Sequence, residues 1–208
     1  MLLEVVGKHL DLINLSAESK WIGLPQIERT QLNFRRPMLN SLWKIQSSKE
    51  DFLYWWKNKN KVSIFFDGAS KGNPGNVGAS GLIFLPGGRI QTSFSWGLGQ
   101  LSNNQAELYA LLKACQLATE AGHSNLQIFG DSELIIKVLN SASKFFHPSL
   151  NVTMHRLHFI LIECMSVSSF HILRELNKSV DLKANQGCLL PQGMLSLNDL
   201  PSVMHLIP

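Results

Sequence analysis

The chain has 208 residues, and 45% of them are hydrophobic, so it can bury a core and is not a disordered linker. Charged residues make up only 16%, and the formal net charge of +4 permits a polyanionic partner without requiring one. The three cysteines are widely spaced without a CxxC pair, which argues against a disulfide scaffold and a cysteine zinc site. No apolar run is long enough to span a membrane, and Glu4 and Lys8 argue against a signal peptide, so we expect an intracellular protein.

The first 60 residues hold scattered apolar side chains with no sustained period, and we predict a weakly structured N-terminal extension. We interpret this segment as a connection left over from a larger polyprotein. Its Trp55 and Trp56 are candidates for stacking on nucleic acid, whereas Trp96 is expected to pack in the core. The basic run KNKNK at residues 57–61 marks the predicted domain boundary.

Residues 61–188 show a regular succession of elements and form the predicted main domain. Apolar runs, alternation, turn clusters and glycines place strands at 62–66, 81–86, 90–96, 126–129 and 170–173, and helices at 103–121, 131–141, 152–165 and 180–189. The order βββαβααβα indicates an α/β fold with a five-stranded mixed sheet flanked by helices, three antiparallel strands being followed by two parallel ones. Residues 189–208 hold three prolines and are predicted to be an irregular tail.

Four carboxylates of this charge-poor domain lie at strand ends or early in helices, namely Asp67, Glu107, Asp131 and Asp181. Each alone has an ordinary explanation, as a turn former, a first-turn helix residue or an N-cap. If they met in one crevice they would repel one another, and divalent cations would remove that repulsion. Oxygen-only ligands favour Mg²⁺ or Mn²⁺, and the sequence has no HExxH motif that would indicate hydrolytic zinc.

Four short motifs carry a family resemblance: FDGASKGNPG at residues 66–75, NNQAEL at 103–108, GDS at 130–132 and NKSVD at 177–181. In this combination and order the chain resembles type 1 ribonuclease H over about residues 61–188. It is similar to the ribonuclease H domains of plant retroelement reverse transcriptases and their host relatives. Two departures are Val180, where the family usually has a small residue, and the lack of a basic insertion between the helices.

The resemblance implies an endonuclease that hydrolyses the RNA strand of an RNA–DNA hybrid by two-metal phosphodiester cleavage, with Mg²⁺ as cofactor and Mn²⁺ as a substitute. Asp67 would lie between both ions, with Glu107 and Asp131 on one side and Asp181 on the other. We expect the domain to act as a monomer. With the four ligands set aside, residues 61–188 hold ten basic and four acidic side chains, which suits a nucleic-acid backbone.

Further residues of the motifs would contact the substrate. The resemblance assigns Gly72, Asn73, Asn103 and Gln105 to the RNA 2′-hydroxyl and Ser102 and Asn104 to a DNA phosphate, although Asn73 also suits a simple turn and Asn103 an N-cap. Asn177 is expected to position His171, Asp181 or the loop between them.

His171 lies ten residues before Asp181, the spacing of a family histidine that assists water activation or product release. A neutral imidazole near pH 7 suits proton shuttling. A strand histidine with a structural hydrogen bond explains the residue equally well.

Two other functions remain open at this stage. A degenerate retroelement fragment could keep the fold as a catalytically silent nucleic-acid-binding module. A 3′–5′ exonuclease or an integrase is a related alternative with different acidic chemistry, which the GNPG and NNQAE runs disfavour.

Overall fold

The computed structural model describes residues 44–45, 52, 56, 61–72, 75–141, 145, 147–200 and 203–204. All of them lie within one structural unit, residues 35–208. Asn73, Trp55 and most of the predicted N-terminal extension therefore lie outside the described residues.

The predicted sheet is confirmed in its strand directions and gains strands at both edges. The meander is β2 (Val62–Gly72), β3 (Gly75–Phe84) and β4 (Ile90–Leu101), and the parallel strands are β5 (Asn125–Gly130) beside β2 and β6 (Ser166–Ile172) beside β5. The added strands are β1 (Lys44–Ile45), β7 (Met194–Leu197) and β8 (Val203–Met204). The complete order is β1-β6-β5-β2-β3-β4-β7-β8, so the described sheet has eight strands instead of the expected five.

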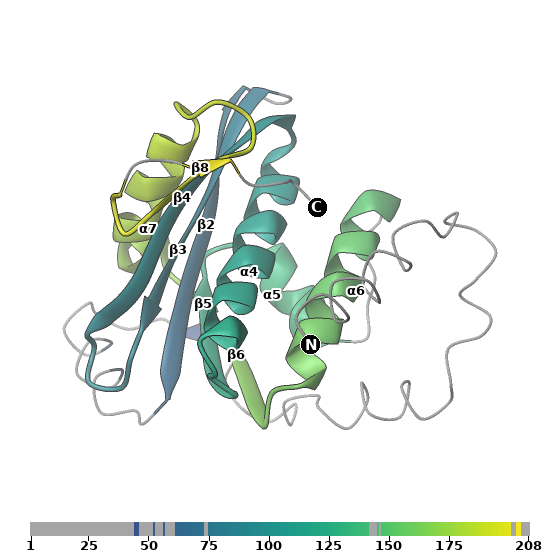
Figure 1. The fold of residues 1–208 in the computed structure, drawn as a ribbon. Coiled ribbons are helices and arrows are strands. Elements are labelled where there is room, and N and C mark those ends of the chain that lie inside the picture. The colour runs from purple at the N-terminus through teal and green to yellow at the C-terminus, as the bar shows by residue number, and fades with distance from the viewer. Residues whose placement is uncertain are drawn as a thin grey trace, which may run out of the picture. The chain divides into compact units, whose positions relative to one another are not determined.

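Helices cover both faces of this sheet (Figure 1). They are α4 (Asn103–Glu120), α5 (Glu133–Asn140), α6 (Pro148–Ile162) and α7 (Arg174–Gly187). In the figure α7 lies on one side of β2, β3 and β4, and α4 lies on the other side with α5 and α6 beyond it. The order βββαβααβα is thus the central part of the fold.

Several predicted boundaries differ from those of the structure. Strand β3 begins at Gly75 instead of Gly81, because the glycine-rich turn continues the β2–β3 ladder as far as the Gly72–Gly75 pair. Helix α7 begins at Arg174, six residues before the expected start. The segment predicted as an irregular tail contributes β7 and β8.

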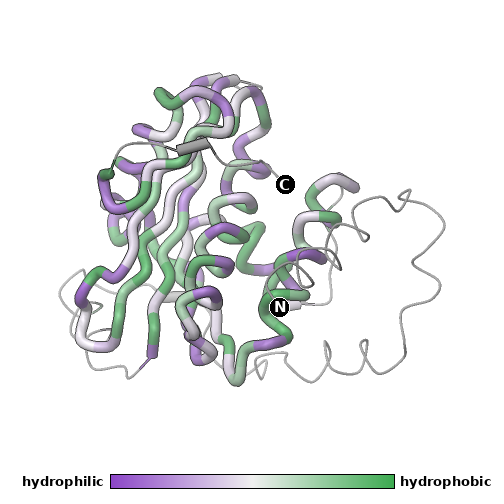
Figure 2. The backbone as a smooth tube through the Cα atoms, in the orientation of Figure 1, coloured by the Kyte–Doolittle hydropathy of each residue, from purple (hydrophilic) through white to green (hydrophobic). Residues whose placement is uncertain are grey.

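The main core lies between the sheet and helices α4 and α6. Ile64 and Phe66 of β2 point into it, together with Leu108 of α4 and Leu157 of α6. Helix α4 is buried nearly all round, as its apolar sequence predicts. Figure 2 shows hydrophobic residues concentrated along the central strands.

A second cluster contains residues from the segment predicted to be an extension. Phe65 of β2 and Phe129 of β5 stack with ring centroids 4.8 Å apart. Phe52 packs edge-on against both rings, and Trp56 packs edge-on against Phe65. Trp56 also meets Phe84 at 4.8 Å. We call these five residues the aromatic cluster. Since Phe52 is 3% and Trp56 8% exposed, this described part of the extension belongs to the domain core.

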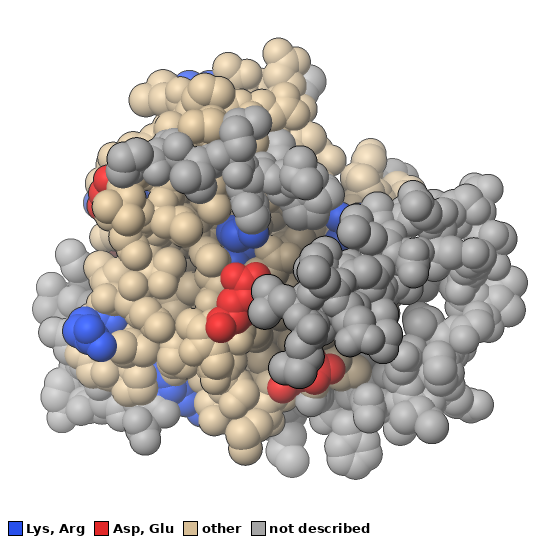
Figure 3. Space-filling view, viewed as in Figure 1, with Lys and Arg blue, Asp and Glu red and all other residues tan. Residues whose placement is uncertain are grey.

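The surface agrees with the charge-poor composition. On the face shown in Figure 3, the described Lys, Arg, Asp and Glu side chains form small scattered groups among uncharged atoms. None of the helices in the described part of the chain is long and apolar enough to cross a membrane.

Candidate functional site

Three of the four predicted carboxylates meet at the carboxyl end of β5. Strand β5 pairs with β2 only as far as Phe65, and Asp67 lies two residues further along β2. Asp131 follows the last residue of β5, and Glu107 comes from the second turn of α4. One carboxylate oxygen from each of Asp67, Glu107 and Asp131 lies within 4.8 Å of the other two. The crevice beyond a parallel strand is a usual ligand site in α/β sheets.

A close backbone approach brings Glu107 to Asp67. A Cβ atom added to Gly68 would lie 2.2 Å from the backbone nitrogen of Glu107. Only glycine leaves enough room for α4 to lie this close to β2. The glycine that follows Asp67 in the first motif is therefore needed to assemble the carboxylate group.

Two buried carboxylate oxygens in this group lack partners among the described residues. Asp67 Oδ1 accepts a hydrogen bond from the Gly68 backbone N–H at 2.9 Å, and Asn103 Nδ2 lies 3.5 Å from Glu107 Oε1. Asp67 Oδ2 and Glu107 Oε2 are buried and accept no hydrogen bond. Leaving buried acceptor oxygens without partners is costly. These two oxygens are therefore expected to bind a group that the described residues do not supply.

The electrostatics of the group point the same way. Burial, followed by the charges of Asp131 and Asp181, raises the pKa of Asp67 from 3.8 to about 8. Burial and the charges of Asp67 and Asp131 raise the pKa of Glu107 well above its ordinary value. The protein alone therefore resists ionising both carboxyls at neutral pH, and a bound cation would reverse that preference.

Asn177 holds Asp131 in place. Its Nδ2 donates to Asp131 Oδ1 at 2.9 Å and to the Phe66 backbone carbonyl at 3.0 Å. The side chain is completely buried. These contacts differ from the expected partners His171 and Asp181, because the Asn177 amide ties α7 to β2 and to the residue that follows β5.

The fourth predicted carboxylate, Asp181, has other partners in the structure. Asp181 Oδ1 accepts from Arg174 Nη2 at 3.0 Å, and Oδ2 accepts from Asn185 Nδ2 at 3.3 Å. It lies outside the three-carboxylate group, although its charge still raises the pKa of Asp67. The sequence reasoning missed Arg174, whose charge lowers the pKa of both Asp67 and Glu107. Its position seven residues before Asp181, two turns earlier on the same face of α7, was the available signal.

His171 lies on β6 beside Gly130. Its Nε2 is 3.1 Å from the backbone oxygen of Asp131, and its Nδ1 is buried. These contacts favour the structural alternative, in which the imidazole fixes the end of β5, over a freely moving proton carrier.

The predicted substrate residues at the start of α4 have a second task. The N-cap is Ser102, not Asn103, and a capping box forms in which the Gln105 side-chain oxygen accepts from the Ser102 backbone N–H at 3.0 Å. The capping oxygen of Gln105 is thereby occupied, and its NH₂ group is the part left for a substrate. Asn104 and Gly72 are exposed, with Gly72 at a φ of 107°.

Comparison with known proteins gives a consistent result. A family model described as reverse transcriptase-like matches residues 65–187. A curated ribonuclease HI of Halobacterium salinarum is 32% identical over 126 residues, which are 61% of this chain and 63% of the relative. A putative ribonuclease H protein of Arabidopsis thaliana is 32% identical over 69% of this chain, which spans only 23% of that relative.

Solved structures match the same region. The crystal structure of RNase H1 from Halobacterium salinarum aligns with a TM-score of 0.59 and 32% identity, covering 61% of this chain and 96% of that one. LC11-RNase H1, isolated from compost and solved in complex with an RNA/DNA hybrid, aligns with a TM-score of 0.58 and 28% identity over 62% of this chain and 96% of that one.

Proposed function

The chain belongs to the reverse transcriptase-like family, and we propose that it is a metal-dependent endonuclease that hydrolyses the RNA strand of RNA–DNA hybrids. The observation that carries this proposal is the group formed by Asp67, Glu107 and Asp131, whose ligand oxygens lie within 4.8 Å of one another. The relatives named ribonuclease H and the hybrid-bound structure of LC11-RNase H1 support the choice of substrate.

Divalent cations fit this site on chemical grounds. All three residues offer oxygen ligands, which suits Mg²⁺ or Mn²⁺. A metal site without its cation is expected to have carboxylate oxygens without partners and raised carboxyl pKa values. Asp67 and Glu107 show both features. When bound, two such ions would supply a more acidic attacking water and stabilise the leaving 3′ oxygen.

The chain's own residues would orient this chemistry. Asp67, Glu107 and Asp131 would hold the divalent cations through their carboxylate oxygens. Asn177 fixes the carboxylate of Asp131 by its 2.9 Å hydrogen bond. Asp181, whose carboxylate is now paired with Arg174, would be a further ligand for the cations if that ion pair opened. Since Arg174 is exposed, this opening requires no change in the core.

Recognition of the hybrid would use the surface next to these ligands. Gly72 at the end of β2 and Asn73, the next residue in the sequence, are proposed to meet the RNA strand near its 2′-hydroxyls, together with Asn103 and the NH₂ group of Gln105. The exposed amide of Asn104 is proposed to meet a phosphate of the DNA strand. The Ser102 hydroxyl would join it by turning its proton from Gln105 Oε1, 2.9 Å away, to the phosphate.

The test is cleavage of a labelled RNA–DNA hybrid by the full chain with Mg²⁺ or Mn²⁺. We expect cuts within the RNA strand that leave 5′-phosphate and 3′-hydroxyl ends, and no cutting by Asp67→Asn or Glu107→Gln. Asp199→Asn is the matched control, because Asp199 is an exposed carboxylate paired with Lys183 away from the three-carboxylate group. An intact hybrid after long incubation with the folded parent protein would refute the proposal, and hybrid binding without cleavage would identify a catalytically silent module.

A further inference from the structure

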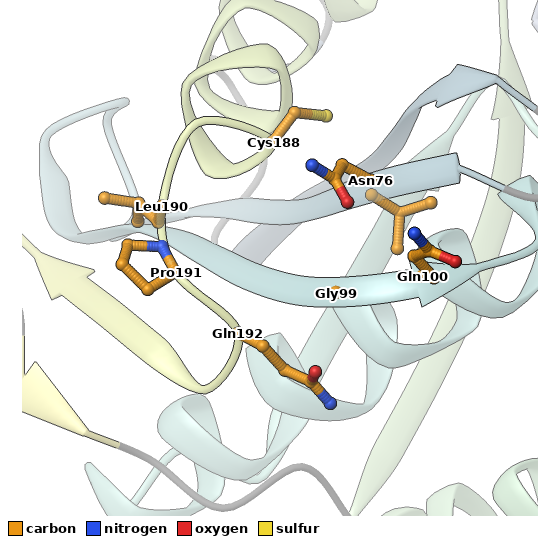
Figure 4. A pocket seen from close by; sticks show the side chains of 8 residues that line it. Asn76, Gly99, Gln100, Cys188, Leu190, Pro191 and Gln192 are labelled. Carbon is orange, nitrogen blue, oxygen red and sulfur yellow. The ribbon is translucent and has the colours of Figure 1, made fainter.

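A pocket of about 520 Å³ opens where β3 begins and β4 ends (Figure 4). Three amide side chains line it, those of Asn76, Gln100 and Gln192, and the remaining wall comes from residues that include Cys188 and Pro191. Its size falls in the range of roughly 300–1,000 Å³ that small-molecule sites occupy. None of the carboxylates of the metal group lines this pocket, so it is a separate feature of the fold.

The far wall of the pocket is fixed by contacts between backbones. Residues 190–193 lie directly on β4, where the Gly193 N–H donates to the Gly97 carbonyl at 2.8 Å. A Cβ atom added to Gly97 would lie 2.4 Å from the Pro191 carbonyl oxygen. Gly99 has a φ of +75°, and a Cβ atom there would lie 2.7 Å from the Gln192 side chain. Side chains at either glycine would push this wall away from the strand.

The lining has the hydrogen-bonding chemistry of a nucleobase site. Asn76 and Gln100 lie opposite each other on neighbouring strands, and both are exposed, so their amides are accessible. Each amide offers an acceptor and two donors, the combination that reads base edges. Lys71 lies opposite Asn76 on β2 and is exposed, so it places a positive charge beside the pocket for a phosphate.

The pocket also adjoins the surface proposed to bind the hybrid. The ladder pairs Gly75 with Leu101, the residue directly before Ser102, and Gly72 with Gly75. A nucleic-acid strand that runs past the end of β2 and the start of α4 would therefore reach the pocket next. We propose that the pocket holds an unpaired nucleobase of a single-stranded segment that continues from the hybrid. This inference rests on the proposed function, because it extends the same substrate by one nucleotide beyond the duplex.

The test is fluorescence anisotropy with the full chain carrying Asp67→Asn to prevent cleavage, in Mg²⁺ buffer. The probes are a blunt RNA–DNA hybrid, the same hybrid with a short RNA or DNA extension at either end, and the single strands alone. We expect one extended hybrid to bind about tenfold more tightly than the blunt one, as one base contact of ordinary strength allows. The double substitution Asn76→Ala with Gln100→Ala should abolish that gain and leave the affinity for the blunt hybrid unchanged. Asn125→Ala, an exposed amide at the start of β5, should leave both affinities unchanged.

The outcomes separate this inference from the proposed function. If no extension increases affinity, or if the gain survives the double substitution, the pocket proposal is wrong while cleavage of blunt hybrid still supports the enzyme. If the parent protein cleaves no hybrid but binds single strands more weakly after the double substitution, the pocket is supported and the enzymatic proposal fails. Both substituted side chains are exposed, so a folded variant is expected, and circular dichroism checks this.

Discussion

Metal-free protein should lose stability as the pH rises, because the fold buries carboxyls that resist ionisation. The pKa of Asp67 is 3.8 ordinarily and about 8 in the fold, so its favourable contribution is complete below pH 3.8 and is lost as the pH rises through 8. Linkage over that interval predicts a loss of about 3–4 kcal/mol in unfolding free energy between pH 5 and pH 8. The raised pKa of Glu107 acts with the same sign. Asp67→Asn removes the titrating group and should make the protein more stable than the parent at pH 8.

The assay is urea unfolding of parent and Asp67→Asn proteins at pH 5, 6.5 and 8, in EDTA and in Mg²⁺. The parent should recover stability at pH 8 when Mg²⁺ is present, whereas the variant should respond less because one ligand is missing. Asp199→Asn should behave as the parent does, since its carboxylate is 76% exposed. The reasoning would be refuted if the metal-free parent were equally stable at pH 5 and pH 8. It would also be refuted if the unfolding free energy of Asp67→Asn fell with pH as steeply as that of the parent.

Three other substitutions probe the structure around the carboxylates. Asn177→Ala should lower metal affinity or activity roughly 10–100-fold by releasing Asp131, measured by Mg²⁺ titration of cleavage, and an unchanged titration would contradict that role. Gly68→Ala should cost about 1–3 kcal/mol and weaken activity, because its Cβ would meet the Glu107 backbone, and chemical unfolding with a cleavage assay would show both effects. Trp56→Ala should cost about 3–5 kcal/mol in chemical unfolding, and a cost near zero would exclude Trp56 from the core.

The central fold was predictable because its signals are local. Alternating residues in 62–66, the turn glycines and the apolar helix after residue 102 each specify one element with its direction. The edge strands were not predictable in the same way. Strand β1 pairs Lys44 with His171, and two residues so far apart in the chain carry no local pattern that links them. Phe52 and Trp56 likewise find their partners only in the folded sheet.

The site shows the same division between composition and orientation. The motifs identified Asp67, Glu107 and Asp131, because the ends of adjacent strands and a closely packed helix must bring them together. The motifs did not predict the orientations of the side chains on α7. Asp181 pairs with Arg174 two turns earlier on the same face of α7, and Asn177 points inward to Asp131. The spacing of a motif assigns residues to an element. Whether a side chain joins the three-carboxylate group also depends on which other residues bind it.

The two outermost strands of the described sheet have a consequence for how the protein behaves in a crowded solution. β1 and β8 are only two residues long, and they lie outside the longer strands β6 and β7. A long open strand edge invites pairing with another molecule, and very short outer strands blunt that tendency. The residues at 44–45 and 203–204 thus guard against self-association. Removing β1 or β8 by shortening the chain is therefore expected to expose an edge of β6 or β7 and to favour aggregation.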